Sequence, residues 1–327
     1  MKLNYFYNNT RKIEELLKKI EVAKGILEYI PQLTHVENNL RRKSLLKSSV
    51  FSARIEGNKL TYDKVKHSNL NSKDLEKKEI QNILTALQWL YSKNSQKTLN
   101  KNLILNLHTK VMSGITKSGK FRNEFSGVFN SAGNVVYFAP PPNEVPNLIL
   151  ELINTTNKKH SSTPTKSAVF HFTFEKIHPF LDGNGRVGRL LSTFILKQKG
   201  YDFRGLISLE EYMDTNKQTY YDLLNIEKRD ITQFVEFFLQ GLVIQSEKVL
   251  EELKKTKYET EEDTLLPRRR EILELIEDHK LVSFNFIKRR FLNVPNSTLH
   301  YDLKKLEDEN FIKKIGETRG ALYTSIN

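Results

Sequence analysis

With 327 residues, the chain is long enough for two or three domains, and its 38% hydrophobic and 28% charged residues are typical of a globular protein. The absence of cysteine excludes disulfides and thiolate metal sites, and with no bilayer-spanning apolar run and no signal-peptide pattern we expect a cytoplasmic protein without a membrane partner. The net charge of +13 favours encounters with polyanions, but the lysines are interleaved with acidic residues and do not by themselves predict nucleic-acid binding.

The N-terminal part of the chain is predicted to be helical. Apolar residues at helical spacing predict a helix that begins after the cap Thr10 and is stopped by Pro31. A second helical stretch runs from about Thr34 to Gly57, which suits a left-handed C-cap. Glu56 then lies in the last turn, where the helix dipole disfavours an anion.

A hairpin is predicted in the middle of the chain. A polar connector from Asn69 to Lys78 precedes two helical stripes, at 80–91 and 103–112. Strand-like residues at 128–129 and 135–138 then flank a turn-rich loop, and three prolines end the pairing. An exposed hairpin edge can pair with an extended peptide of another protein.

Two helices are predicted around the residue pair His178-Pro179. Thr163 and Pro164 indicate the start of a buried helix, which should end at His178 because a proline disfavours helical torsions in the residue before it. An amphipathic helix follows, with apolar positions from Val187 to Ile195.

The start of this second helix has the composition of an anion site. Arg186 and Arg189 lie in its first turns, although cations are disfavoured at that end of the helix dipole. With the unpaired backbone amides they predict an anion site, and we expect a nucleotide polyphosphate. Gly183 and Gly185 let the backbone approach phosphates closely, and Asn184 tolerates a left-handed conformation and can hydrogen-bond a phosphate.

Two side chains beside these glycines supply chemistry. Next to phosphates, a carboxylate such as Asp182 is favourable when it ligates Mg²⁺. His178 can take a proton from an incoming hydroxyl, because an unperturbed histidine titrates near neutrality. The ordered set predicts phosphoryl or nucleotidyl transfer.

The stretch His178–Arg189 resembles, at every defined position, the motif of Fic-domain proteins, His-x-Phe-x-(Asp/Glu)-Gly-Asn-Gly-Arg-x-x-Arg. The resemblance covers roughly Leu33 to Gln245 and implies a helical core with a β-hairpin flap. Most Fic enzymes transfer AMP from ATP to a hydroxyl side chain of a target protein and release pyrophosphate. ATP and Mg²⁺ are therefore the implied cofactors.

The resemblance also implies a role for each motif residue. His178 would be the general base, Asp182 the Mg²⁺ ligand and Arg189 the residue that holds the γ-phosphate. Phe180 would anchor the loop. The phosphate cradle would consist of Gly183, Asn184, Gly185 and Arg186.

An upstream segment resembles the inhibitory motif (Ser/Thr)-x-x-x-Glu-(Gly/Asn) of one Fic subclass, through Ser52, Glu56 and Gly57. The resemblance implies that Glu56 pairs with Arg189 and keeps that arginine from the γ-phosphate, so that ATP binds only unproductively. The alternative is that Glu56 is an ordinary solvated residue before a glycine cap.

Two further features follow from the resemblance. Related proteins use aromatic and polar groups after the motif helix against the adenine, which makes Tyr212 and Tyr221 candidates, although tyrosines at helical spacing also occur in cores. The flap, about 127–140, is implied to pair with the backbone of a target protein. The alternative is a purely structural hairpin.

The C-terminal part is predicted to be a separate domain. Residues 246–266 are a charged helix that fades into a linker. Residues 267–327 resemble a winged helix-turn-helix with Ser283 and Ser297 as helix caps and a two-stranded wing. Its third helix offers polar residues for DNA, but the acidic run at 307–309 would repel phosphates, so a protein-interaction or dimerisation module is the alternative.

We therefore expect a mainly α protein with a helical region at 1–98, which carries an inhibitory helix at about 44–57, a Fic core at 99–245 and the winged helix. The expected function is Mg-ATP-dependent protein adenylylation restrained by Glu56, on a target protein docked at the flap. The alternatives are de-adenylylation, transfer of another phosphate-containing group, or a nucleotide-sensing DNA-binding regulator. Self-adenylylation, with a second copy of the chain in a homodimer, is a further alternative.

Overall fold

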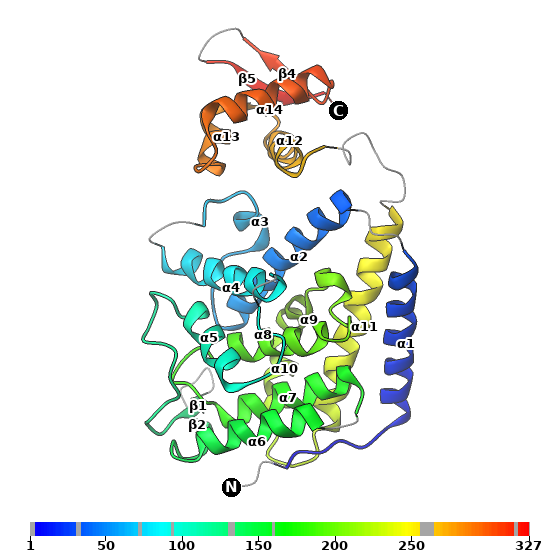
Figure 1. Ribbon diagram of the computed structural model, residues 1–327, viewed down its shortest axis with the longest axis vertical. Helices are drawn as coiled ribbons and strands as arrows, with labels where there is room; N and C mark the ends of the chain where they lie inside the picture. The colour runs from blue at the N-terminus through cyan, green and yellow to red at the C-terminus, as the bar shows by residue number, and fades with distance from the viewer. Residues whose placement is uncertain are drawn as a thin grey trace.

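The computed structural model describes residues 4–30, 34–70, 74–92, 95–129, 135–158, 161–255, 265–316 and 320–326. It is mainly helical, as expected, and Figure 1 shows a large helical body below a smaller C-terminal domain. The body contains α1 (Arg11–Tyr29), α2 (Thr34–Ile55), α3 (Tyr62–Val65), α4 (Leu75–Tyr91), α5 (Lys101–Val111), α6 (Val145–Lys158), α7 (Thr163–Ile177), α8 (Asn184–Lys197), η1 (Phe203–Gly205), α9 (Leu209–Thr215), α10 (Lys217–Leu224) and α11 (Thr232–Lys255).

The first and last helices of the body lie side by side (Figure 1). α1 begins after Thr10, whose hydroxyl accepts a hydrogen bond from the Ile13 amide, as the cap prediction requires. In the segment 246–266, where a charged helix that fades into a linker was expected, α11 continues through Lys255 with an apolar stripe that stays buried, formed by Val249, Leu250 and Leu253. The rest of that segment up to 264 lies outside the described residues.

α7 and α8 form the centre of the body. α7 is buried on nearly every face, and its N-cap is Ser162 rather than the expected Thr163, because the Ser162 hydroxyl accepts from the Thr165 amide. α8 packs along α7 and buries the apolar stripe predicted between Val187 and Ile195. The motif spans the loop between these two helices and the first turns of α8.

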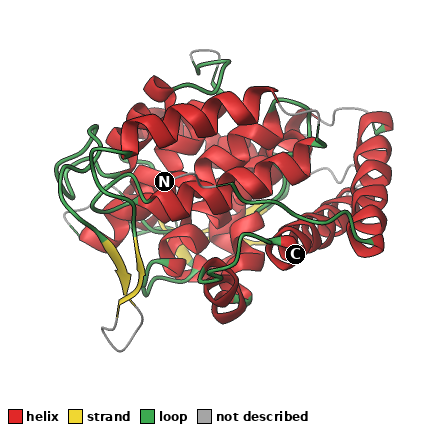
Figure 2. Ribbon diagram, turned by 90° about the horizontal axis from the view of Figure 1, so that it is seen from below, coloured by secondary structure: helices red, strands yellow, loops and turns green. Residues whose placement is uncertain are grey.

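The predicted hairpin is formed by β1 (Gly127–Phe129) and β2 (Val135–Phe138), which pair antiparallel with an irregularity between Val128 and Phe129. Figure 2 shows the two strands at one edge of the helical body. The turn at 130–134 lies outside the described residues. α3 and α6 are not among the predicted elements.

The C-terminal domain has the element order of a winged helix. It contains α12 (Pro267–His279), β3 (Val282–Ser283), α13 (Phe284–Arg290), α14 (Asn296–Asp308), β4 (Ile312–Ile315) and β5 (Leu322–Ser325). The expected two-stranded wing is formed by β4 and β5, which pair antiparallel. β3 adds a third described strand to this sheet, in the order β3-β5-β4, and the apolar core of the domain is separate from those of the body. Ser283 caps α13 as predicted, whereas Ser297 lies inside α14, which begins directly after Pro295.

This domain contacts the body through polar groups on α2 and the segment after α3 (Figure 1). Lys66 Nζ lies 3.1 Å from an Asp278 carboxylate oxygen, and the His67 ring contacts the same carboxylate. Arg290 Nη1 donates to the Ser68 carbonyl at 2.7 Å. The domain is therefore joined to the body near the helix that carries Glu56.

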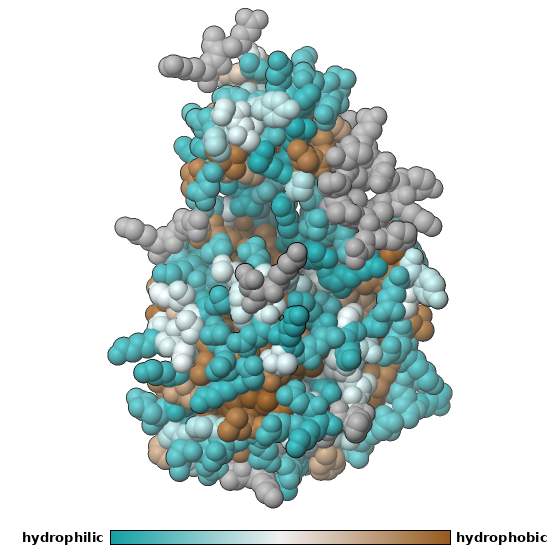
Figure 3. All heavy atoms as spheres, viewed as in Figure 1, coloured by the Kyte–Doolittle hydropathy of each residue, from teal (hydrophilic) through white to brown (hydrophobic). Residues whose placement is uncertain are grey.

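Polar side chains dominate the visible surface. Figure 3 shows hydrophilic residues over most of that face, with apolar residues gathered lower down, in front of α6, α7 and α10. Within the described ranges, no helix combines the length and apolar character needed to cross a membrane.

Candidate active site

His178 is held in a defined orientation at the end of α7. It is the C-cap residue and has a left-handed backbone, with φ 49° and ψ 60°. Its ring Nδ1 lies 3.3 Å from the Glu175 carbonyl oxygen, which can only accept, so Nδ1 carries the proton and Nε2 keeps a lone pair. Burial lowers the pKa of His178. A neutral imidazole with a free Nε2 is the form that a general base requires.

Arg122 joins this histidine to the flap. Its buried guanidinium donates to the His178 carbonyl at 2.8 Å and to the Pro140 carbonyl at 2.5 Å, and its backbone amide donates to the Pro179 carbonyl at 2.9 Å. A single charged side chain thus satisfies backbone acceptors of both the motif loop and the segment that follows β2. Arg122 therefore fixes the position of the flap relative to His178.

The side chain of Asn184 shapes the motif loop from inside. Its Oδ1 accepts from the Phe180 amide and its Nδ2 donates to the Phe180 carbonyl, both at 2.8 Å. The Phe180 ring is fully buried and stacks on His108 of α5 with 3.6 Å between ring centroids. The side-chain amide of Asn184 is therefore hydrogen-bonded to the Phe180 backbone, and not placed to bond a phosphate as was expected from the sequence.

Two glycines are required by the geometry at the start of α8. Gly183 is the N-cap and has φ 86°, a conformation that side chains rarely adopt. Gly185 lies directly under Glu56, because a Cβ atom at Gly185 would come within 2.3 Å of Glu56 Oε1 and 3.0 Å of Arg189 Nη1. Without a side chain at Gly185, an anionic group can approach the backbone closely, and the Glu56 carboxylate lies at this position.

Asp182 stands at the edge of this turn and its side chain is 51% exposed. Its Oδ1 accepts from the Gly183 amide and from Arg186 Nη2, both at 2.6 Å. No cluster of three His, Asp or Glu side chains in the described part of the chain is placed to hold a metal ion. Mg²⁺ bound through one carboxylate, phosphate oxygens and water needs no such cluster, so a single exposed carboxylate at a phosphate site fits this ion.

Arg189 is paired with the helix that precedes the core, as the resemblance to the inhibitory motif implies. Its guanidinium donates to Glu56 Oε1 at 2.8 Å and to the Ser52 hydroxyl and carbonyl oxygens at 2.9 Å each. The arginine side chain is 2% exposed and the glutamate side chain 28%. Arg189 Nη1 is buried and has no hydrogen-bond partner among the described residues, so it remains available to an anionic ligand.

The charges of this pair support one another. Burial alone would raise the pKa of Glu56, but the charges of Arg189 and Arg186 outweigh burial and lower that pKa below its ordinary value. Burial likewise opposes the charged form of Arg189, while the Glu56 carboxylate raises the pKa of that guanidinium. Both groups are therefore charged at neutral pH.

The last turn of α2 places Glu56 over the site. The Asn58 amide donates to the Ala53 carbonyl at 3.1 Å and the Gly57 amide to the Arg54 carbonyl at 3.0 Å, the two bonds of a Schellman C-cap. Gly57 has φ 105°, as the predicted glycine cap requires. Glu56 is consequently the last residue before the chain turns away from the cradle.

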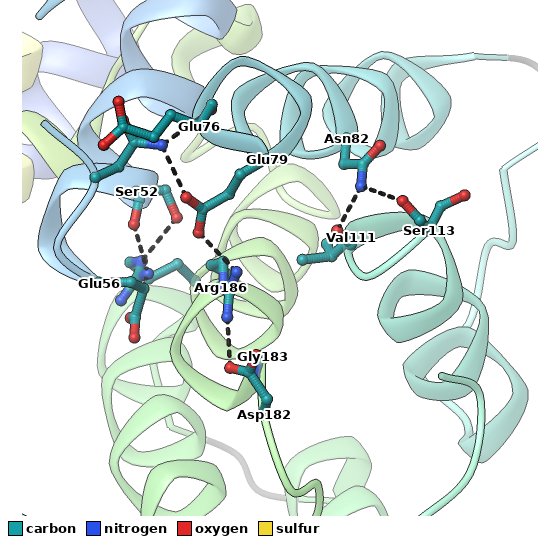
Figure 4. Close-up of polar contacts among 12 residues, drawn as sticks. Ser52, Glu56, Glu76, Glu79, Asn82, Val111, Ser113, Asp182, Gly183 and Arg186 are labelled. Carbon is teal, nitrogen blue, oxygen red and sulfur yellow. Dashed lines mark hydrogen bonds and ion pairs between the residues drawn. The ribbon is translucent and has the colours of Figure 1, made fainter. Parts of the chain in front are cut away.

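Arg186 has a partner that the sequence analysis missed. Its Nη1 donates at 2.6 Å to Glu79 of α4, a residue 107 positions away in the chain. Figure 4 shows Glu79 and Asp182 on either side of this guanidinium. Glu79 lies beside an apolar stripe of α4 and belongs to no recognisable pattern, so no sequence signal identified it.

The two candidate adenine residues lie in different surroundings. The Tyr221 hydroxyl donates to the Ile55 carbonyl at 2.8 Å, which places it against the end of α2 and near Glu56. Tyr212 packs on Phe237 of α11, with ring centroids 4.9 Å apart. Tyr212 therefore packs between α9 and α11, in the core environment that tyrosines at helical spacing often have.

Glu175 is a buried carboxyl that sequence reasoning also missed. Burial raises its pKa to about 8, and its Oε1 has no partner in the described part of the chain. A Cβ atom at Gly188 would come within 2.2 Å of that oxygen, so α7 and α8 touch closely there. Only packing shows this, because in sequence Glu175 next to Lys176 is an ordinary pair of charged residues within a helix.

The segment that carries the motif matches a known protein family. Residues 98–196 match the model of the Fic/DOC family, so the chain carries a Fic domain. It is 37% identical over 106 residues to a protein of Aquifex aeolicus named as a probable protein adenylyltransferase, and covers 32% of each chain. It is 26% identical over 241 residues to the protein adenylyltransferase Fic of Drosophila melanogaster, covering 68% of this chain and 46% of that protein. The chain thus spans less than half the length of these curated relatives.

Two solved structures share the fold. A Fic family protein from Desulfovibrio desulfuricans superposes with a TM-score of 0.69 at 22% identity, over 98% of both chains. A Fic domain containing signaling protein from Bacteroides thetaiotaomicron superposes with a TM-score of 0.61 at 22% identity, over 75% of this chain and 97% of that one. The first of these likenesses extends over nearly the whole chain, so it includes the C-terminal domain.

Proposed function

We propose that this chain transfers AMP from ATP to a hydroxyl side chain of a protein, and that Glu56 restrains the transfer. Two observations support this proposal. A neutral His178, whose Nε2 keeps its lone pair, ends α7. Arg189 lies in α8 after the glycine turn, and its Nη1 has no hydrogen-bond partner among the residues that the structure describes. A proton acceptor and an anion site therefore adjoin each other. The relatives named protein adenylyltransferases support AMP as the transferred group.

The proposed step is an in-line displacement at the α-phosphorus. Nε2 of His178 takes the proton of the target hydroxyl, the hydroxyl oxygen bonds to the α-phosphorus, and the bond to the β-phosphate oxygen breaks so that pyrophosphate leaves. The backbone amides at the start of α8 and the guanidinium of Arg189 hold the phosphates. Mg²⁺, held by Asp182, would neutralise charge on the phosphate oxygens.

Glu56 opposes this arrangement in the state described. It occupies the position over Gly185 where a phosphate oxygen would approach, and it takes a guanidinium donor of Arg189. The γ-phosphate of ATP and the Glu56 carboxylate would compete for the guanidinium of Arg189. ATP would bind in a misaligned way until the end of α2 moves.

Labelled ATP tests the proposal. Label from the α-phosphate and not from the γ-phosphate should appear on protein, should increase with Glu56→Gly and should disappear when His178→Ala is added. Label from the γ-phosphate alone would make the protein a kinase. No label on the chain itself or on a cell lysate, with ATP still bound by Glu56→Gly, would refute adenylylation. Release of AMP from a modified protein, lost with Glu56→Gly, would instead support de-adenylylation.

The flap is the proposed docking element for a target in the cytoplasm. Arg122 holds the end of β2 next to His178, and Phe138 is 77% exposed on that strand. A target backbone that pairs with the flap would bring a hydroxyl side chain toward the base. A second copy of this chain is one such target, and label on the chain itself in the α-phosphate assay would support self-adenylylation.

A second candidate function, duplex DNA binding by the winged helix, rests on the exposed side of that domain. The acidic residues Glu274 and Asp278 of α12 face lysines of the body, while Lys304 on α14 and Lys313 and Lys314 on β4 are exposed. Titration of the full chain with duplex DNA tests this candidate. Affinity that falls steeply with salt, and falls further with Lys313→Ala and Lys314→Ala, is the expected result; salt-independent or absent binding would refute it.

A further inference from the structure

The segment that follows the inhibitory glutamate is fastened to α4. The Asn58 side chain is buried, and its Nδ2 donates to Glu79 Oε2 at 2.8 Å and to the Glu76 carbonyl at 2.9 Å. The Lys59 amide adds a longer bond to Glu76 Oε1 at 3.3 Å. Asn58 is thus bonded to α4 by its side chain and to α2 by its backbone.

Glu79 also binds Arg186, the arginine at the start of α8. Glu79 uses Oε2 for Asn58 and Oε1 for Arg186 Nη1, at 2.6 Å (Figure 4). The side chains of Glu79 and Arg186 are 15% and 7% exposed, so solvent screens this ion pair little. Arg186 Nε is buried and unpartnered within the described ranges, which leaves a donor in the cradle.

We infer that Glu79 is a positioning residue that couples the two halves of the site: through Asn58 it fixes the end of the inhibitory helix, and through Arg186 it orients the cradle. This inference rests on the proposed adenylyl transfer and its restraint by Glu56. Asn58 acts through Glu56, because the two residues flank Gly57 in one Schellman turn and cannot move independently.

Two substitutions separate the two halves. Asn58→Ala removes both side-chain bonds to α4 and leaves Glu56, Ser52 and Arg189 in place. Glu79→Gln keeps an amide oxygen that can accept from Asn58 but removes the charge opposite Arg186. The matched control is Asn82→Ala, because Asn82 also lies on α4 and donates to two carbonyl oxygens, of Val111 and Ser113, at 2.9 Å each (Figure 4).

The first measurement is transfer from α-labelled ATP. Asn58→Ala should raise the rate by about tenfold, which corresponds to the loss of about 1.4 kcal/mol of closed-state stabilisation. It should add nothing in the Glu56→Gly background, since the anchor acts only through Glu56, and Asn82→Ala should match the wild type. If Glu56→Gly is active but Asn58→Ala transfers AMP at the wild-type rate, Asn58 does not hold the inhibitory helix and this part of the inference is overturned.

The second measurement compares ATP dependence in the Glu56→Gly background. Glu79→Gln should raise KM for ATP by about tenfold, as loss of one oriented charged contact does, and change kcat much less, because His178 is untouched. Equal KM values with and without Glu79→Gln would overturn the cradle role. A merely structural role would lower the amount of folded enzyme and hence kcat, with KM unchanged.

Amide exchange keeps the inference testable if no transfer occurs in any variant, the outcome that refutes the proposed function itself. Peptides covering residues 45–56 should exchange about tenfold faster in Asn58→Ala than in the wild type or in Asn82→Ala, since the last turn of α2 loses its anchor. Unchanged exchange in these peptides would overturn the coupling between Asn58 and the inhibitory helix, whatever the reaction.

Discussion

Replacing Glu56 by glutamine removes the charge that holds Arg189 and changes little else. Breaking a fully buried ion pair costs about 3–5 kcal/mol, whereas an exposed pair contributes up to about 1 kcal/mol. The Arg189 side chain is 2% exposed and that of Glu56 28%, so this pair lies between those limits, at about 2 kcal/mol. Since each 1.36 kcal/mol is a factor of ten, Glu56→Gln should raise the rate of AMP transfer by about 30-fold.

The assay is initial-rate incorporation of α-labelled ATP at saturating nucleotide, with Glu15→Gln as control. Glu15 also pairs with an arginine at 2.9 Å, but on the exposed side of α1, so its substitution should leave the rate unchanged. Because Arg189 holds the pKa of Glu56 below its ordinary value, the carboxylate stays charged at neutral pH and above. The stimulation by Glu56→Gln should therefore be the same at about pH 6.5 and about pH 8.

A rate for Glu56→Gln within twofold of the wild type, with Glu56→Gly strongly active, would refute the electrostatic reasoning. It would mean that the bulk of the side chain over Gly185, rather than its charge, blocks the phosphate. If Glu56→Gln and Glu56→Gly raise the rate of AMP transfer equally, the ion pair accounts for the whole inhibition.

Three further predictions concern groups around the site. Because burial lowers the pKa of His178, transfer by Glu56→Gly should stay level as the pH falls through the ordinary histidine value of 6.5 and decline only below it; a midpoint at or above 6.5 would contradict a buried neutral base. The pKa of Glu175 is raised from 4.5 to about 8, so between these values the native state keeps a proton that the unfolded chain loses, and stability should fall by up to a few kcal/mol as the pH rises. Urea unfolding should show that this fall disappears in Glu175→Gln, and a fall of equal size in that variant would rule out Glu175 as its source. Asn184→Ala removes two buried bonds to the Phe180 backbone and should lower the free energy of unfolding by about 2–3 kcal/mol, measured by urea titration; a loss below about 0.5 kcal/mol would mean that water replaces the amide.

Local sequence patterns were sufficient to predict the first two helices of the body. The helix after Thr10 and the helix of Glu56 begin and end within a few residues of their predicted bounds, because their caps are set by neighbouring residues. For the segment 246–266, the sequence indicated a charged helix that fades into a linker, but not that this helix packs on the body. Residues 246–255 look charged in sequence, but three apolar positions bury them against the body and extend α11.

The motif and its opposing charge were also readable from the chain. Arg189 at a positive helix end and Glu56 at a negative one are each unfavourable alone, and the resemblance to the inhibitory motif implied that the two residues pair. Because the residues between Gly183 and Arg189 lie within two turns of one another, spacing alone places them at a common anion site. Such short-range geometry depends only on helix periodicity.

The partners that complete the site come from tertiary packing. Glu79 is 107 residues from Arg186 and 21 from Asn58 along the chain. In sequence it looks like any glutamate of a helix, and nothing indicates that its carboxylate binds both of these residues. Likewise, the Asn184 amide is polar enough to bind phosphate in principle, and only the packed loop commits it to Phe180. Local sequence determined the helices, the motif and the two opposed charges, because these depend on near neighbours; the fold alone decided which carboxylate meets which arginine, because desolvation and long-range packing select those partners.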